Sequence, residues 1–83
     1  MKIGFYKLWP KGPVLTSYVT VTDNGEIVWG YNSYAIKQLL SDFEHPKLGG
    51  RFDINNPEHI KMLPQILTGN HFFAAEIDVQ NRD

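Results

Sequence analysis

Residues 15–31, LTSYVTVTDNGEIVWGY, decide the fold because they place two β-rich runs on either side of a turn sequence. A three-residue loop of Asp23, Asn24 and Gly25, with Gly25 left-handed in a bulge, separates apolar from polar side chains. A two-residue turn at Asn24 and Gly25 would mix them on both sides of the hairpin. The sequence therefore predicts an antiparallel hairpin with the three-residue loop. Its core side is expected to comprise Val19, Val21, Ile27, Trp29 and Tyr31.

Two further strands are expected near the ends of the chain. Residues 2–9 form the first strand, which the prolines and the glycine of residues 10–13 bring to an end. Residues 71–79 form the last strand. In the first strand, the alternation places Ile3 and Phe5 on one side and Tyr6 and Leu8 on the other. In the last strand, we expect Phe73, Ala75 and Ile77 to point inward and Phe72, Ala74, Glu76 and Asp78 to point outward.

Between these strands the apolar spacing changes to that of helices. Residues 34–44 carry apolar side chains at helical spacing, which predicts a helix. This helix should end before His45-Pro46, since a residue before proline avoids the helical region. Residues 57–67 form a second helix with Asn56 as its N-cap, kinked or broken at Pro64. The predicted fold is α+β, in the order β-β-β-α-(α)-β. A small antiparallel sheet carries one or two helices packed on one face.

Length and composition favour one domain over residues 1–83, with an ordinary hydrophobic fraction of 42%. The absence of cysteine excludes disulfides, thiolate metal sites and cysteine nucleophiles. No apolar run is long enough for a signal peptide or a membrane span, so we expect a cytoplasmic protein without membrane contact. A net charge of −1 argues against binding driven by nucleic-acid phosphates.

Residues that carry chemistry are present but do not form a recognisable motif. The three histidines, His45, His59 and His71, belong to different elements and lack the spacing of zinc ligands. Gly49-Gly50 lacks the spacing and the following lysine of a phosphate-binding loop. None of the serines stands in a nucleophile elbow. We therefore expect no enzyme, no catalytic or metal-binding residue and no cofactor, with a small hydrolase or metal-dependent enzyme as the third hypothesis.

The side of the sheet opposite the predicted core carries aromatic and aliphatic residues, and apolar patches of this kind mark interfaces. We expect partner binding there, through Tyr6, Leu8, Tyr18, Val28 and Phe72. The leading hypothesis is a non-catalytic protein-binding module whose partner is another protein or a second copy of the chain. By analogy with other small chains without motifs, it would be an inhibitor of phage or mobile-element origin that occupies a partner's surface.

The alternative hypothesis is a binder of single-stranded nucleic acid, because aromatic side chains on a sheet stack bases. Tyr6, Tyr18 and Phe72 would supply the rings. Nucleic acid is the disfavoured partner, since Glu26 and Glu76 are expected on the same side of the sheet. If a helix covers this side, the surface around Trp9 and Lys11 is the next place to expect binding.

Overall fold

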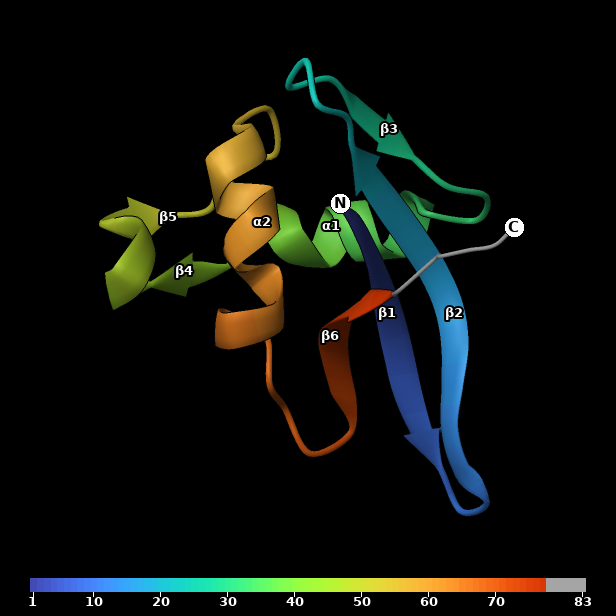
Figure 1. Ribbon diagram of the computed structural model, residues 1–83. Coiled ribbons are helices and arrows are strands. Elements are labelled where there is room, and N and C mark those ends of the chain that lie inside the picture. The colour runs from blue at the N-terminus through green and yellow to red at the C-terminus, as the bar shows by residue number, and fades with distance from the viewer. Residues whose placement is uncertain (78–83) are drawn as a thin grey trace.

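The computed structural model describes residues 1–77 and shows a four-stranded antiparallel sheet with two α-helices (Figure 1). The strands follow the spatial order β3-β2-β1-β6. They are β1 (Lys2–Trp9), β2 (Gly12–Val21), β3 (Ile27–Trp29) and β6 (Phe72–Ile77). The last strand therefore returns to the free side of β1, and the predicted α+β class is confirmed.

The hairpin of β2 and β3 has the predicted three-residue loop. Val21 pairs with Ile27, and the backbone N–H of Thr22 donates to the carbonyl of Glu26 at 2.9 Å, which leaves three residues in the loop. Gly25 has a φ of 84°, in the left-handed region that favours glycine. The inward placement of the paired β2 and β3 side chains is confirmed too, because Val19 and Val21 are buried and Ile27 and Trp29 pack against the core.

Tyr31 departs from this prediction, since its side chain is 84% exposed. Strand β3 ends at Trp29, and Asn32 adopts a φ of 65° as the chain turns toward the next helix. The alternation of a strand therefore no longer applies at Tyr31, and the prediction that Tyr31 belongs to the core is wrong.

The inward side of β6 was also predicted wrongly. Residues that pair directly in an antiparallel sheet share a face. Phe5, which is buried, pairs with Ala74, whereas Tyr6 pairs with Phe73. Ala74 is accordingly buried and Phe72 packs against the core, so the prediction was off by one residue. Asp78, which was assigned to the same strand, lies outside the described residues.

The two predicted helices are present as α1 (Tyr34–Ser41) and α2 (Pro57–Ile66). Helix α1 ends three residues earlier than predicted, because Glu44 and His45 are extended and form the short strand β4 (Glu44–His45). Strand β4 pairs with β5 (Gly50–Arg51), and the short 3₁₀ helix η1 (Pro46–Leu48) connects the two. Helix α2 begins as predicted, with the Asn56 side chain accepting from the Glu58 N–H, and continues through Pro64.

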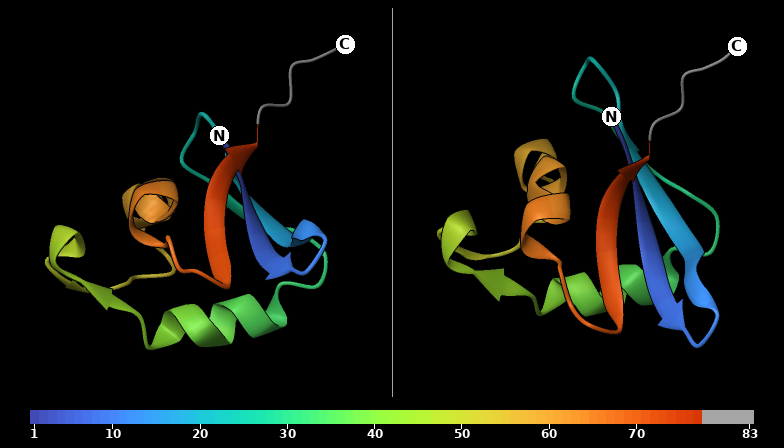
Figure 2. Two further views of the ribbon diagram at one scale, coloured as in Figure 1. Left: turned by 90° about the horizontal axis from the view of Figure 1, so that it is seen from below. Right: turned by 60° about the horizontal axis from the view of Figure 1, so that its bottom comes forward.

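Both helices contribute to one hydrophobic core on a single side of the sheet, as Figure 2 shows from two directions. Leu40 of α1 and both Ile60 and Leu63 of α2 are fully buried against it. From the sheet the core takes Ile3, Phe5, Val19, Val21 and Ala74. Within residues 1–77, neither helix is long and apolar enough to cross a membrane.

Candidate functional site

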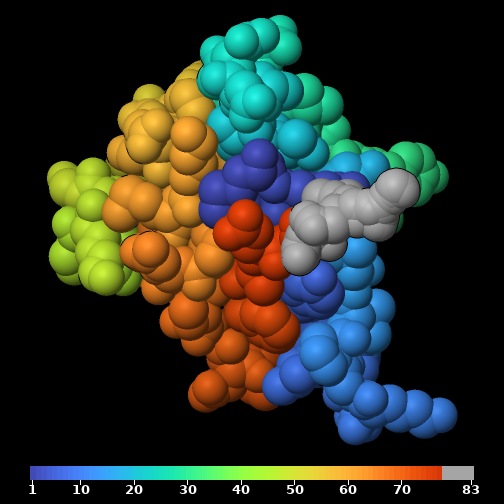
Figure 3. All heavy atoms as spheres, viewed as in Figure 1, coloured from blue at the N-terminus to red at the C-terminus, as the bar shows by residue number. Residues whose placement is uncertain are grey.

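The side of the sheet away from the core, called the outer face below, is formed by alternate residues of all four strands. Its centre is the pair Tyr6 and Phe73, whose rings stack with centroids 5.3 Å apart and planes 14° apart. The register places the other members around them: Lys2, Gly4, Leu15, Tyr18, Thr20, Val28, Ala75 and Ile77. Viewed as in Figures 1 and 3, α1 lies behind the sheet and the strands β1, β2 and β6 reach the surface.

A β-bulge brings Leu15 onto the outer face. Phe5 pairs with Ser17 and Tyr6 with Leu15, so Thr16 is an extra residue in β2. Its hydroxyl donates to the carbonyl of Phe5 at 3.0 Å. The bulge turns Leu15 to the side of Tyr6, while Thr16 and Ser17 both border the opposite side of the sheet.

Glycines allow the outer side chains to lie flat. A Cβ atom at Gly4 would be 2.7 Å from the methyl ends of both Leu15 and Ile77, which therefore close over the Gly4 backbone. At Gly30 a Cβ atom would lie 2.5 Å from the ring of Tyr18. The Tyr18 ring is thus packed down on the sheet and half-buried.

A lysine adds a second contact to the Tyr18 ring. The ammonium of Lys2 lies 4.3 Å from the ring centroid, within the range of a cation–π interaction. Val28, in the neighbouring strand, is 53% exposed. Both helices of the described chain lie on the other side of the sheet. The outer face is therefore an ordered layer of aromatic and aliphatic side chains over which no described helix packs.

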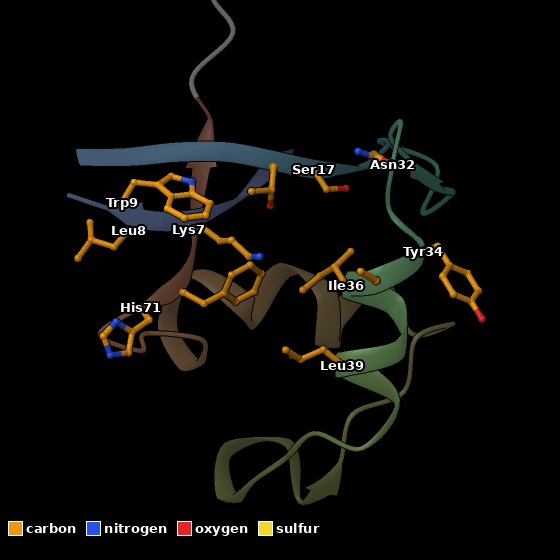
Figure 4. A pocket seen from close by; sticks show the side chains of 12 residues that line it. Lys7, Leu8, Trp9, Ser17, Asn32, Tyr34, Ile36, Leu39 and His71 are labelled. Atoms are coloured by element: carbon orange, nitrogen blue, oxygen red, sulfur yellow. The ribbon is translucent and has the colours of Figure 1, made fainter. Parts of the chain in front are cut away.

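A second surface lies on the inner side of the sheet, beyond the part that the helices cover. The β1–β2 hairpin projects past the body of the molecule, and its tip is visible at the lower right of Figure 3. Between this hairpin and α1 is a cleft of about 790 Å³ (Figure 4). Lys7 and Trp9 of β1 line one wall and Ile36 and Leu39 of α1 the other.

The five residues predicted to bind a partner divide between these two surfaces. Tyr6, Tyr18 and Val28 lie on the outer face, as expected. Leu8 follows at the end of β1, where it is 48% exposed and borders the cleft. Phe72 is on the inner side, against Phe5, and lines the cleft. Its predicted outward orientation is wrong because of the one-residue error in β6.

Sequence reasoning missed Leu15, Phe73 and Ile77 as members of the outer face. Phe73 and Ile77 would have followed from pairing β6 with β1, which the sequence does not specify. Glu76 also changes sides, because it pairs with the buried Ile3 rather than lying beside Tyr6. The acidic charge that Glu76 was expected to place on the outer face is therefore absent from it.

Two histidines and one serine make short-range hydrogen bonds to the backbone. The Nδ1 atoms of His45 and His59 accept backbone N–H bonds from Lys47 and Asp53, at 3.1 and 2.9 Å. Within residues 1–77, no group of three or more histidine, cysteine or acidic side chains lies close enough to hold a metal ion. The Ser41 hydroxyl donates to the carbonyl of Gln38.

Comparison with known proteins finds no matching family model, no matching curated protein and no matching solved structure. Function must therefore be argued from the two surfaces themselves.

Proposed function

We propose that this chain is a non-catalytic protein-binding module that uses its outer face. The observation that supports the proposal is the aromatic layer of Tyr6, Tyr18 and Phe73, which is ordered by contacts within the sheet and has no described helix over it. Rings of this kind supply large contact areas and dominate the binding energy of many interfaces.

The packing of the layer favours binding for a second reason. Binding is weaker when side chains must first be ordered on contact, because that ordering costs free energy. Tyr18 is already held between Gly30 and the Lys2 ammonium, and Tyr6 is already stacked on Phe73. A partner would therefore meet a preformed surface. The mode of action we propose is inhibitor-like, because the chain would occupy this area of a partner and carry out no chemical step.

The test compares two exposed aliphatic residues, one on each surface. Val28 on the outer face is 53% exposed, and Leu39 on the rim of the cleft is 48% exposed. Val28→Glu should leave the fold intact but remove the bound partner, because burying an unpaired carboxylate in an interface is costly. Leu39→Glu should retain the partner. Circular dichroism checks the fold, and affinity capture from host lysate with sedimentation of the purified chain detects a foreign or an identical partner.

The two variants separate the outcomes. A protein captured by wild type and by Leu39→Glu, but lost from Val28→Glu, supports the outer face. Capture that survives Val28→Glu in a folded protein contradicts the proposal.

Single-stranded nucleic acid remains the alternative partner, and the structure adds one observation in its favour. Glu76 is not on the outer face, whereas Lys2 lies over Tyr18 there. Bases would then stack on Tyr6, Tyr18 and Phe73. Retention of an oligonucleotide that falls steeply with added salt, and that Val28→Glu abolishes, would favour this alternative over protein binding.

A further inference from the structure

The cleft between the sheet and α1 has a buried hydroxyl at its inner end. Ser17 is 4% exposed and is the one polar side chain that the structure buries within residues 1–77. Its Oγ atom lies 3.5 Å from the carbonyl oxygen of Tyr31, whereas hydroxyl hydrogen bonds are typically about 2.7–2.8 Å long. Buried polar groups normally have a close partner. The Ser17 hydroxyl has only this long contact among the described residues, and Ser17 lines the cleft.

The first turn of α1 lies at the same end of the cleft. Ser33 is at the N-cap position but its side chain makes no capping hydrogen bond, and the first turn holds no acidic residue. The first backbone bond of the helix runs from the Lys37 N–H to the Ser33 carbonyl, so the preceding N–H groups have no acceptor within the helix. These N–H groups give the end of a helix a partial positive charge that favours anions. Asn32 lies near Ser17 in Figure 4, and Ala35 of the first turn also lines the cleft.

The charged and apolar groups of the cleft complete the pattern. Lys7 projects into the cleft, with its ammonium 5.9 Å from the centroid of the Trp9 ring (Figure 4). No carboxylate is among the described residues that line the cleft. The remaining walls are largely apolar, with Trp9 and Phe72 from the sheet side and Leu39 from α1. A volume of about 790 Å³ is within the usual range for small-molecule sites, roughly 300–1,000 Å³.

We propose that this cleft binds a small amphipathic carboxylic acid. The Ser17 hydroxyl and the first turn of α1 donate hydrogen bonds to the carboxylate, and the Lys7 ammonium faces the same space. The apolar body of the ligand packs against Trp9, Phe72 and Leu39. The site uses the side of the sheet opposite the outer face, so it does not depend on the function proposed for that face.

The experiment uses 3-phenylpropanoate as the probe and its neutral amide, 3-phenylpropanamide, as the matched control compound. Titration at neutral pH is followed by amide NMR shifts and by the fluorescence of the tryptophans. We expect saturable shifts at Ser17, at residues 34–36 and at the Trp9 indole. The acid should bind roughly tenfold more tightly than the amide, because hydrogen bonds to a charged group are stronger.

Three variants test the named contacts. Ser17→Ala should weaken binding of the acid roughly tenfold, and Lys7→Gln roughly fivefold, since exposed ion pairs are weaker. Lys37→Gln is the matched control for Lys7, because its ammonium also lies near a tryptophan ring, 5.4 Å from that of Trp29, and it does not line the cleft. It should bind the acid as wild type does. Circular dichroism establishes that each variant is folded.

Several results would overturn the proposal: no saturable binding of the acid, equal affinity for acid and amide, or shifts confined to the outer face. Because Ser17 is buried, its alanine variant could fail to fold. Lys7→Gln changes an exposed side chain and keeps the test decisive, since equal affinities of Lys7→Gln and Lys37→Gln would also contradict the proposed site.

Discussion

The inner and outer sides of one sheet carry two different kinds of apolar surface. On the inner side, Ile3, Phe5 and Val19 are completely buried beneath two helices. On the outer side, Tyr6 and Tyr18 are only half-buried, although both pack closely within the sheet. The same strands therefore bury aliphatic side chains and a phenylalanine inward and present tyrosine rings outward.

The difference between the two sides follows from the chemistry of the side chains. Valine and isoleucine have no polar atoms, so complete burial leaves no hydrogen-bonding group unsatisfied. Tyrosine has an apolar ring and a hydroxyl that needs a partner, which suits it to a surface that is wet on one side and packed on the other. An outer face rich in tyrosine is thus compatible with exposure to water before a partner arrives.

Two phenylalanines from neighbouring strands should differ most in how much stability their removal costs. Phe5 is fully buried between Trp29 and Phe72, with ring centroids 6.2 and 6.4 Å away. Phe5→Ala should lose about 3–5 kcal/mol, which approaches the total stability of many small domains. Phe73→Ala should lose only about 1–2 kcal/mol, since its ring is partly exposed. Urea unfolding followed by circular dichroism measures both.

Equal losses for the two variants would mean that Phe73 lies on the core side, so that the assignment of the two sides of β6 would be reversed. The sequence pattern alone favoured that reversed assignment, so this pair of variants tests the structure directly against it.

The sequence predicted the hairpin well because two independent signals agree there. The loop residues Asp23, Asn24 and Gly25 favour a three-residue loop, and the alternation on both strands fits the same register. In β6 the sequence Phe72-Phe73-Ala74-Ala75 presents one aromatic and one small residue to each side. The next residues, Glu76 and Ile77, favour an inward Phe73, and pairing with β1 and packing against α2 override this local signal.

The candidate sites could be predicted only in part, where the sequence settled which side of a strand faces inward. Tyr6, Tyr18 and Val28 follow from strands whose inward sides were clear. Leu15 depends on the bulge at Thr16, which has no proline or glycine to mark it. The cleft depends on how α1 crosses the sheet, and no local pattern of residues specifies that crossing.

A second prediction concerns how firmly the outer aromatic layer is held. A Cβ atom at Gly30 would meet three atoms of the Tyr18 ring at 2.5–2.7 Å, and a rigid ring must swing away as a whole. Gly30→Ala should therefore destabilise by about 1–3 kcal/mol. Gly4→Ala should have a smaller effect, because its Cβ atom meets the flexible methyl ends of Leu15 and Ile77 at 2.7 Å and the Tyr6 ring only at 3.0 Å.

Urea unfolding ranks the two glycine variants, and NMR of the Tyr18 ring protons reports its displacement. If Gly30→Ala is as stable as wild type and the Tyr18 signals do not move, the ring is not held against Gly30. The outer face would then be a mobile set of side chains and not a surface preformed for binding.

The lysines of the two surfaces should contribute least to stability. The Lys2 ammonium is 4.3 Å from the Tyr18 ring centroid, whereas the Lys7 ammonium is 5.9 Å from that of Trp9 in the cleft. Because the attraction between a cation and an aromatic ring weakens with distance, Lys2→Gln should destabilise by about 0.5–1 kcal/mol and Lys7→Gln by less. The outer lysine would thus secure its ring, while the lysine of the cleft would remain available to a ligand.

A double-mutant cycle of Lys2→Gln with Tyr18→Leu, followed by urea unfolding, isolates the coupling between the two side chains. A coupling energy within error of zero would show that Lys2 does not hold Tyr18.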